Sequence, residues 1–221
     1  MKRLICIFLL STMAIFAQPL SLSQLVYQIR DPSTDSANFR QTLEKIGEYL
    51  ALDLLEELDT EEIAIQTLTG AEATHLLVTE VPVLVTILRG GFPLNAGVHK
   101  VFPKAEVGFL AMSRNEETLQ PDLSYVALPD MKGKSVIISD TMLATGGSLL
   151  DAIRVVEQRQ PKNIFVIVAM ASKQGIERIV SYNPSIKIFT AAIDPTLNEK
   201  GFIVPGLGDA GDRAYGKKSS K

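Results

Sequence analysis

From residue 76 onward, short apolar runs alternate with helix-like segments, and this alternation constrains the fold more than any other feature of the chain. The apolar runs are Val83 to Leu88, Glu106 to Met112, Ser135 to Ser139, Ile164 to Met170 and Ile186 to Ile193. Continuous apolar runs are typical of parallel strands, because helices cover both faces of a parallel sheet. The intervening segments 93–101, 147–158 and 173–181 carry apolar residues at helical intervals and suit right-handed crossovers. The sequence therefore predicts the α/β class, with an open, mainly parallel twisted sheet flanked by helices.

The segment before these runs predicts helices. Residues 20–58 have apolar residues at helical spacing on either side of a breaker, Asp31-Pro32-Ser33-Thr34-Asp35. In open parallel sheets, ligands bind outside the carboxyl ends of the strands. We therefore expect the chemistry in the loops that follow Leu88, Met112, Ser139 and Ile193.

Length and charge limit the kind of protein. With 221 residues and 46% hydrophobic residues, the chain can bury one substantial core, so one domain is expected. The formal net charge of −3 provides no broad basic field, which argues against a nucleic-acid partner.

The amino terminus predicts a signal peptide over residues 1–17. Lys2 and Arg3 precede the apolar stretch Leu4 to Phe16, and the small residue Ala17 follows. That stretch is too short for a comfortable membrane span, so none is expected in the mature form. The alternative is a buried first strand or helix. Residues 18–216 are the expected domain and 217–221 a polar tail.

The most informative loop runs from Asp140 to Ser148. It connects a predicted strand to a predicted helix, and Gly146 and Gly147 let its backbone approach a ligand. Backbone amides at the helix start, the hydroxyls of Thr145 and Ser148 and the helix dipole all favour a phosphate. Asp140 at the strand tip could accept hydrogen bonds from two ribose hydroxyls. These residues alone are equally compatible with an ordinary helix cap.

The whole string is more specific, because it resembles the uracil phosphoribosyltransferases. Their phosphoribosyl diphosphate loop reads Asp-Pro-Met-Leu-Ala-Thr-Gly-Gly-Ser, and this chain differs only at Thr141. The resemblance extends to Ile87-Leu88-Arg89-Gly90-Gly91, to Arg114-Asn115-Glu116-Glu117-Thr118 and to the stretch from Gly201 to Asp212. It covers residues 18–216 and implies the type I phosphoribosyltransferase fold, with a flexible flap at 113–130 and a uracil-binding hood at 194–216.

The resemblance also implies residue roles. Arg89, Asp140 and Asp209 are the expected catalytic residues, with Asp209 ordering the ligands. The residues expected to bind phosphoribosyl diphosphate are Arg89, Arg114, Asp140, Thr141, Met142, Leu143, Ala144, Thr145, Gly146, Gly147, Ser148 and Asp209. Uracil is expected at Ile203, Gly208, Asp209 and Ala210, where main-chain groups match its alternating acceptor, donor and acceptor edge.

The implied reaction is displacement of diphosphate from the anomeric carbon by a nitrogen of uracil, through a transition state with oxocarbenium character, giving UMP. Mg²⁺ is expected as a cofactor held through the substrate, without a dedicated metal site. The resemblance further implies a homodimer or a larger even oligomer, and leaves open a GTP effector.

Three residues near the expected substrate depart from the family: Thr141 replaces proline, Gly90 replaces alanine and Ser113 replaces tyrosine. Thr141 and Gly90 free the backbone, which predicts weaker binding of phosphoribosyl diphosphate.

Two other functions are compatible with the sequence. The predicted signal peptide favours export, for instance to a periplasm, whereas the substrate is an intracellular metabolite and favours the cytoplasm. An exported homologue with weak or absent turnover could act as a uracil or phosphoribosyl-phosphate binding or regulatory protein. An RNA-binding pyrimidine regulator is the weakest candidate, since the chain lacks a basic patch with interleaved aromatic residues.

Overall fold

A computed structural model describes residues 19–114 and 121–218; the signal peptide predicted for residues 1–17 lies outside them. In the described part, six strands form one sheet in the order β5-β4-β3-β6-β7-β8. All neighbouring strands pair in parallel except β4 and β5. The strands are β3 (Val83–Leu88), β4 (Val107–Arg114), β5 (Pro121–Ala127), β6 (Ser135–Leu143), β7 (Asn163–Ser172) and β8 (Lys187–Asp194). The predicted open, mainly parallel sheet is confirmed.

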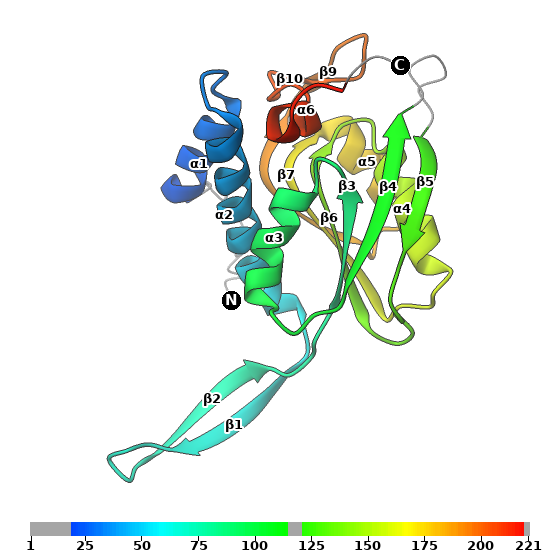
Figure 1. Cartoon of the computed structure of the whole chain (residues 1–221). Helices are drawn as coiled ribbons and strands as arrows, with labels where there is room; N and C mark the ends of the chain where they lie inside the picture. Colours follow the sequence, from blue (N-terminus) through cyan, green and yellow to red (C-terminus); the bar gives the residue numbers. More distant parts are fainter. Residues whose placement is uncertain (1–18, 115–120, 219–221) are drawn as a thin grey trace, which may run out of the picture.

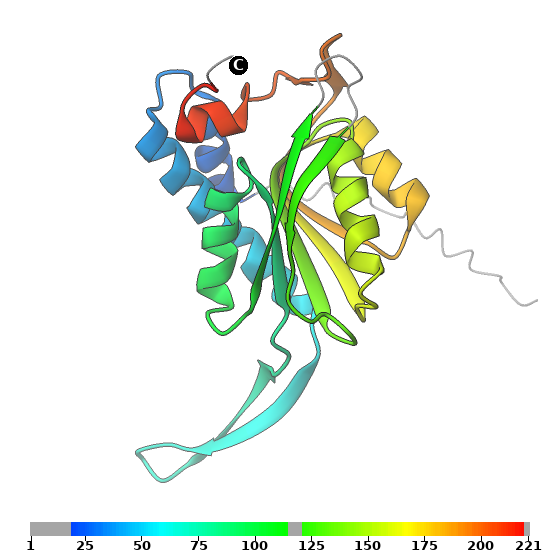
Figure 2. The same cartoon turned by 45° about the vertical axis from the view of Figure 1, so that its right-hand side comes forward.

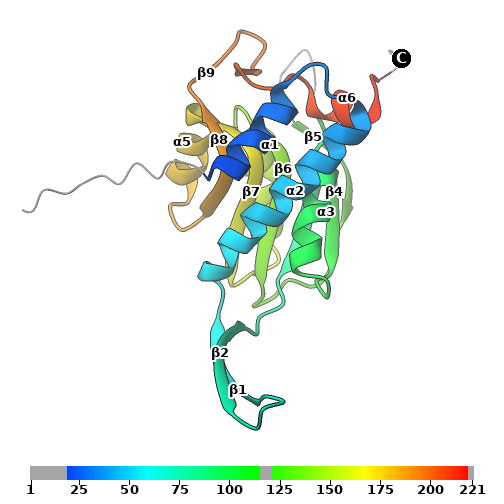
Figure 3. The ribbon, with the colours of Figure 1, turned by 90° about the vertical axis from the view of Figure 1, so that its left-hand side faces the viewer.

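Helices cover both faces of this sheet. One face packs against α1 (Leu20–Arg30), α2 (Ser36–Leu54) and α3 (Phe92–Val101), and the other against α4 (Gly147–Glu157) and α5 (Lys173–Tyr182) (Figures 1 and 3). Successive strand residues therefore enter different cores: Leu84 packs with the first group of helices and Val85 with the second. Because both faces are buried, the strands carry the continuous apolar runs seen in the sequence.

The first two helices begin and end where the sequence predicts. α1 ends at Arg30, just before the Asp31-to-Asp35 breaker. α2 begins after Asp35, whose carboxylate accepts a hydrogen bond from the Asn38 amide at 2.9 Å and so caps the helix. Among residues 19–114 and 121–218, no helix combines the length and the apolar character that crossing a bilayer requires.

A long antiparallel hairpin was not predicted. It comprises β1 (Thr60–Gln66) and β2 (Glu72–Val78), follows the short 3-10 helix η1 (Leu55–Glu57), and projects away from the sheet (Figures 1 and 2). Every residue of β1 is exposed. Since its two strands pair only with each other, the hairpin lacks the hydrophobic backing that an isolated ribbon needs for stability in water.

The structure also refines two predicted segments. β6 continues past Ser139 to Leu143, still paired with β7, so Asp140 lies within a strand and not at its tip. Much of the predicted flap at 113–130 is β5, an edge strand paired with β4. The predicted hood consists of β9 (Thr196–Leu197), β10 (Ile203–Val204) and α6 (Ala210–Tyr215), which lie above the carboxyl ends of the strands (Figure 1).

Candidate active site

Three segments that are far apart in the sequence converge above the carboxyl ends of β3 and β6. We name them the Arg89 loop (Arg89–Gly91), the β6–α4 loop (Asp140–Ser148) and the hood loop (Ile203–Asp212). Gly90 lies at the meeting point: a Cβ atom at this residue would stand 3.6 Å from the Ala210 Cβ, 3.6 Å from the Gly211 nitrogen and 3.9 Å from Asp140 Oδ1. Residues that the sequence singled out in three separate stretches thus surround one point.

The β6–α4 loop ends in a helix start that no side chain caps. Gly146 has φ +77°, a conformation that glycine adopts without strain, and α4 begins at the next residue. No side chain caps this helix start; the Gly147 amide only reaches Thr145 Oγ1 at 3.5 Å. The first amides of α4 and its positive dipole end are therefore oriented to receive an anion.

Two side chains hold the β6–α4 loop from behind. Ser172 Oγ donates to the Ala144 carbonyl at 2.6 Å, and Arg178 Nη1 donates to the Thr145 carbonyl at 3.1 Å. Ser172 is the last residue of β7 and Arg178 lies in α5, and sequence reasoning missed both. A serine at a strand end and an arginine on an exposed helix face carry no functional signal until the fold brings α5 beside the loop.

Asp140 has unusual electrostatics. Burial raises the pKa of its carboxyl from 3.8 to about 7, although hydrogen bonds from the Thr141 and Met142 amides act in the opposite direction. The Thr141 amide donates to Asp140 Oδ1 at 2.7 Å. Because the residue is only partly buried, its carboxyl can reach a ligand at the site. A carboxyl that titrates near neutrality beside a candidate ligand site is characteristic of functional positions.

Arg89 is paired across the site with the hood. Its Nη2 donates to Asp212 Oδ1 at 2.8 Å, and its Nη1 reaches the Gly216 carbonyl at 3.4 Å. The arginine side chain keeps 37% of its surface exposed and the aspartate 30%, so the pair remains accessible to a ligand. A guanidinium group can bind phosphate oxygens in the same bidentate geometry in which it binds a carboxylate.

The hood loop is held by an ion pair whose aspartate is buried and whose arginine is partly buried. Arg30, at the end of α1, donates to both carboxylate oxygens of Asp194 at 2.6 and 2.8 Å, and also to the Gly206 carbonyl at 2.9 Å. Asp194 in turn accepts from the Gly206 amide at 2.9 Å. Burial alone would raise the pKa of Asp194, but Arg30 and the Gly206 amide outweigh it and hold this pKa below its usual value.

Gly206 is required at this point. It has φ +59°, and a Cβ atom there would lie 2.1 Å from the Ile203 carbonyl oxygen. Both of its main-chain polar groups are bonded to the Arg30–Asp194 pair. The turn that orients the backbone between Ile203 and Gly208 is therefore set by two side chains 164 residues apart.

A second arginine attaches the hood loop to the helices. Arg213 lies in α6, donates to the Leu207 carbonyl at 3.0 Å and the Asp31 carbonyl at 2.7 Å, and also bonds the Ile29 carbonyl. Its guanidinium stacks over the ring of Phe39, 4.3 Å from the ring centre. Sequence reasoning missed Arg30, Asp194 and Arg213 as site residues, because their role depends on contacts between distant parts of the chain.

The remaining predicted residues occupy the same rim. Met142 and Leu143 are the last residues of β6 and pair with β7. Ile203 and Ala210 are buried, whereas Gly208 and Asp209 are exposed. Asp209 caps α6 by accepting from the Asp212 amide at 2.9 Å. Arg114 ends β4, and its side chain lies outside the part of the molecule that the structure describes.

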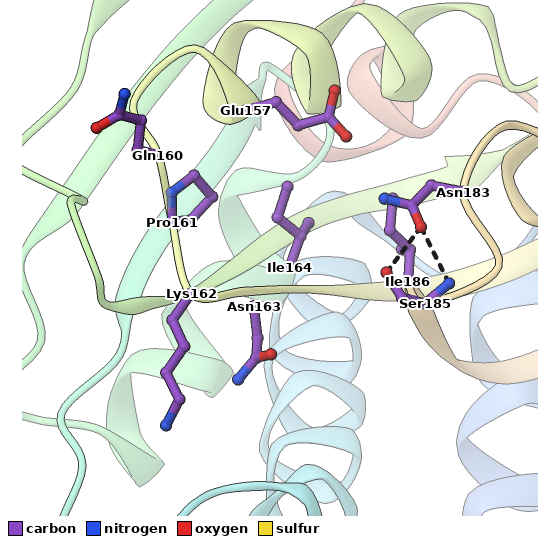
Figure 4. A pocket seen from close by; sticks show the side chains of 9 residues that line it. All are labelled: Glu157, Gln160, Pro161, Lys162, Asn163, Ile164, Asn183, Ser185 and Ile186. Carbon is purple, nitrogen blue, oxygen red and sulfur yellow. Dashed lines mark hydrogen bonds between the residues drawn. The ribbon is translucent and has the colours of Figure 1, made fainter.

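A separate pocket lies at the opposite end of the sheet. Figure 4 shows it between the end of α4 and the residues that precede or begin β7 and β8. Some of the polar groups that line it are hydrogen-bonded to each other. Asn183 Oδ1 accepts from the Ser185 amide at 3.0 Å and from the Ser185 hydroxyl at 2.7 Å. None of the residues predicted from the sequence lines this pocket.

Metal-binding side chains are sparse at the site. Within the described residues, no group of three or more histidine, cysteine, aspartate or glutamate side chains could hold a metal ion. The hood loop brings two carboxylates near Arg89, those of Asp209 and Asp212, and Asp209 is exposed. Such oxygen donors suit Mg²⁺ that is bound mainly by substrate oxygens and water.

Comparison with known proteins gives a consistent result. The family model described as uracil phosphoribosyltransferase matches residues 17–217. A uracil phosphoribosyltransferase from Clostridium kluyveri is 41% identical over 201 residues, covering 90% of this chain and 96% of the relative. One from Halalkalibacterium halodurans is 38% identical over 210 residues, covering 95% and 100%. A solved structure of a protein from Aquifex aeolicus is 38% identical, with a TM-score of 0.83 over 90% of this chain and 96% of the other.

Proposed function

Because the chain belongs to the uracil phosphoribosyltransferase family, we propose that its three converging loops bind phosphoribosyl diphosphate and uracil side by side. The enzyme transfers the phosphoribosyl group to uracil, giving UMP and diphosphate, a step of pyrimidine salvage. One observation carries the residue assignment: a Cβ atom at Gly90 of the Arg89 loop would lie within 4 Å of both Asp140 and the start of α6. No finding favours the exported or inactive alternative.

The β6–α4 loop is proposed to hold the 5-phosphate. Its uncapped helix start and the positive φ of Gly146 support this role. The ionised carboxylate of Asp140 would accept hydrogen bonds from the ribose hydroxyls and stabilise positive charge on the sugar as diphosphate leaves. Because burial holds the pKa of Asp140 near 7, we expect substrate binding to draw a proton from this carboxyl.

The diphosphate is proposed to lie at the Arg89 loop, where Arg89 would exchange Asp212 for phosphate oxygens. Arg114 is proposed as a second phosphate contact. Mg²⁺ carried by the substrate would screen the charge of the leaving diphosphate, with the exposed carboxylate of Asp209 beside it. The flap at 113–130 and the GTP effector stay predictions.

Uracil is proposed to bind at the hood loop through main-chain groups of Ile203, Gly208 and Ala210. A backbone can present donors and acceptors at fixed positions only when its conformation is rigid, and the Arg30–Asp194 pair supplies that rigidity at Gly206. A base with a different edge would leave buried polar groups without partners.

The hairpin is proposed to contact a second copy of the chain. Both of its strands are largely exposed, and it carries the exposed apolar side chains Ile63, Ile65, Leu76 and Leu77. Such a projecting ribbon gains stability only when another surface covers it. This supports the expected homodimer or larger even oligomer, and the mass of the native protein in solution, measured by light scattering, tests it. A monomeric mass at micromolar concentration would contradict the proposal.

The activity is tested with radiolabelled uracil, phosphoribosyl diphosphate and Mg²⁺, using the full chain. We expect labelled UMP from the native protein, and a loss of about a hundredfold or more in Asp140→Asn and Arg89→Ala, because each removes a charged group that contacts the reacting molecule. Absence of product from the native protein at every Mg²⁺ concentration would contradict turnover and favour a binding protein.

A further inference from the structure

Two residues at which this chain departs from its family contact each other. Thr141 is completely buried, and its hydroxyl donates to the Gly90 carbonyl at 2.7 Å. The two residues are 51 positions apart and belong to different loops of the site. The backbone freedom that each substitution introduces is thus opposed by a hydrogen bond between them.

This hydrogen bond lies where no backbone pairing connects the two strands that carry the site. The backbone ladder between β3 and β6 ends at the pair Thr86–Ser139. Beyond it, β3 turns through the Arg89 loop into α3, while β6 continues to Leu143 beside β7. The Thr141 hydroxyl therefore connects β6 to the Arg89 loop beyond the last pairing of the two strands.

Thr141 also acts on Asp140 through its amide. This amide donates to Asp140 Oδ1 at 2.7 Å and so restrains the carboxylate beside the Arg89 loop. Proline, the family residue at this position, has neither an amide hydrogen nor a hydroxyl. By contrast, alanine at position 90 would meet its nearest neighbours at 3.6 Å, which is ordinary contact. The effect of the two departures therefore lies mainly at Thr141.

We propose that Thr141 is a positioning residue whose hydroxyl fixes the Arg89 loop against β6 while its amide orients the Asp140 carboxylate toward the sugar. This inference rests on the proposed function for the identity of the ligand. The contacts predict a larger effect of Thr141 on phosphoribosyl diphosphate than on uracil, since neither hydrogen bond involves the hood loop.

The surroundings of Asp140 bear on its titration. Arg89, Asp209 and Asp212 are the charged residues of the two neighbouring loops, but the pKa of Asp140 is set by burial and by the amides of Thr141 and Met142. The β6 residues that follow it, Thr141 to Leu143, carry no charge. Loss of the Thr141 amide hydrogen therefore removes a donor that favours the ionised carboxylate, and no neighbouring charge along β6 replaces it.

The test compares Thr141→Val, which loses only the hydroxyl, with Thr141→Pro, which loses both donors. Thr141→Ser retains both donors. Thr42→Val is the control away from the site, because it removes another buried threonine hydroxyl, which donates to the Asn38 carbonyl within α2 at 2.8 Å. We expect Thr141→Val to raise the KM for phosphoribosyl diphosphate about tenfold, with the KM for uracil within about twofold, since one buried hydrogen bond is lost. Thr141→Ser should recover most of the affinity that Thr141→Val loses, and Thr42→Val should leave the KM for both substrates within about twofold.

The second readout does not depend on turnover. Titration of the Asp140 carboxyl carbon, followed by nuclear magnetic resonance, should show a higher pKa in Thr141→Pro than in the native protein, and an unchanged pKa in Thr141→Val. If Thr141→Val binds the substrate normally, or if Thr141→Pro leaves the titration unchanged in a folded protein, the inference is overturned. A native protein without turnover would instead contradict the proposed function, and the carboxyl titration would still decide the role of Thr141.

Discussion

The β6–α4 loop and the hood loop differ in what holds them in place. The first continues a buried strand that pairs with β7 as far as Leu143, and it leads directly into an eleven-residue helix. The second follows a two-residue pairing of β9 with β10 and precedes a six-residue helix. Regular structure next to it in the sequence supports the first loop, whereas the second depends on Arg30, Asp194 and Arg213.

This difference indicates which substitutions should disturb the β6–α4 loop and which should disturb the hood loop. The hood loop should be damaged most by changes far away in the sequence. The β6–α4 loop should be damaged most by changes within it, and less by changes in the residues of β7 and α5 that support it. The following predictions test this contrast, in order of decreasing effect.

Arg30→Ala should have the largest effect. It leaves the Asp194 carboxylate, which is only 6% exposed, without its cation, and removing one partner of a buried pair costs about 3 kcal/mol or more. We expect a lower free energy of unfolding in urea and an increase in the KM for uracil that exceeds the increase for phosphoribosyl diphosphate.

Arg154→Ala is the matched control. Arg154 pairs with Asp151 on the surface of α4, with side chains 54% and 38% exposed, and such pairs contribute about 0.5 kcal/mol or less. Equal losses of affinity for both substrates in Arg30→Ala would show that the pair does not act through the hood loop.

The second-largest effect should be a pH dependence of phosphoribosyl diphosphate binding, which depends on Asp140 in the β6–α4 loop and on no residue of the hood loop. With the pKa of Asp140 near 7, binding of phosphoribosyl diphosphate should weaken about tenfold for each pH unit below 7, because the protonated carboxyl must first ionise. Isothermal titration calorimetry between pH 5.5 and 8.5 measures this, and Asp140→Asn should show a flat profile. The raised pKa also means that the contribution of Asp140 to stability is greatest below pH 3.8 and declines as the pH rises toward 7.

Gly146→Ala should produce a smaller, local loss. An alanine at φ +77° costs about 1–2 kcal/mol, and its Cβ would lie 3.2 Å from Arg178 Cδ. We expect a rise of about tenfold in the KM for phosphoribosyl diphosphate, with the KM for uracil unchanged. Gly133→Ala has a similar φ of +69° and open space around it, so it should lower stability without changing either KM. A matching loss of substrate affinity in Gly133→Ala would attribute the effect to general destabilisation.

Arg178→Ala should have the smallest effect. It removes one exposed hydrogen bond to the Thr145 carbonyl, which contributes about 1 kcal/mol or less. Steady-state kinetics should show a rise of a few fold in the KM for phosphoribosyl diphosphate alone. A larger rise would mean that α5 contributes to phosphate binding beyond its support of the loop.

Most of the sheet was predictable because its strands are marked by continuous apolar runs. The five runs correspond to β3, β4, β6, β7 and β8, and the intervening segments to α3, α4 and α5. The edge strand β5 and the hairpin were missed. Tyr125 and Val126 of β5 and every residue of β1 are exposed, so neither strand carries a continuous buried run.

The candidate site likewise has one part that adjacent residues encode and another that depends on contacts between distant residues. The sequence by itself determined the β6–α4 loop, because a strand, a turn that needs glycine and a helix start are all encoded by adjacent residues. Only the tertiary structure decided that Arg30 and Asp194 fix Gly206, that Thr141 reaches Gly90, and that Arg89 faces Asp212. The physical reason is that a side-chain hydrogen bond forms only within about 3 Å, and sequence separation places no limit on which residues the packing of the sheet and helices brings that close.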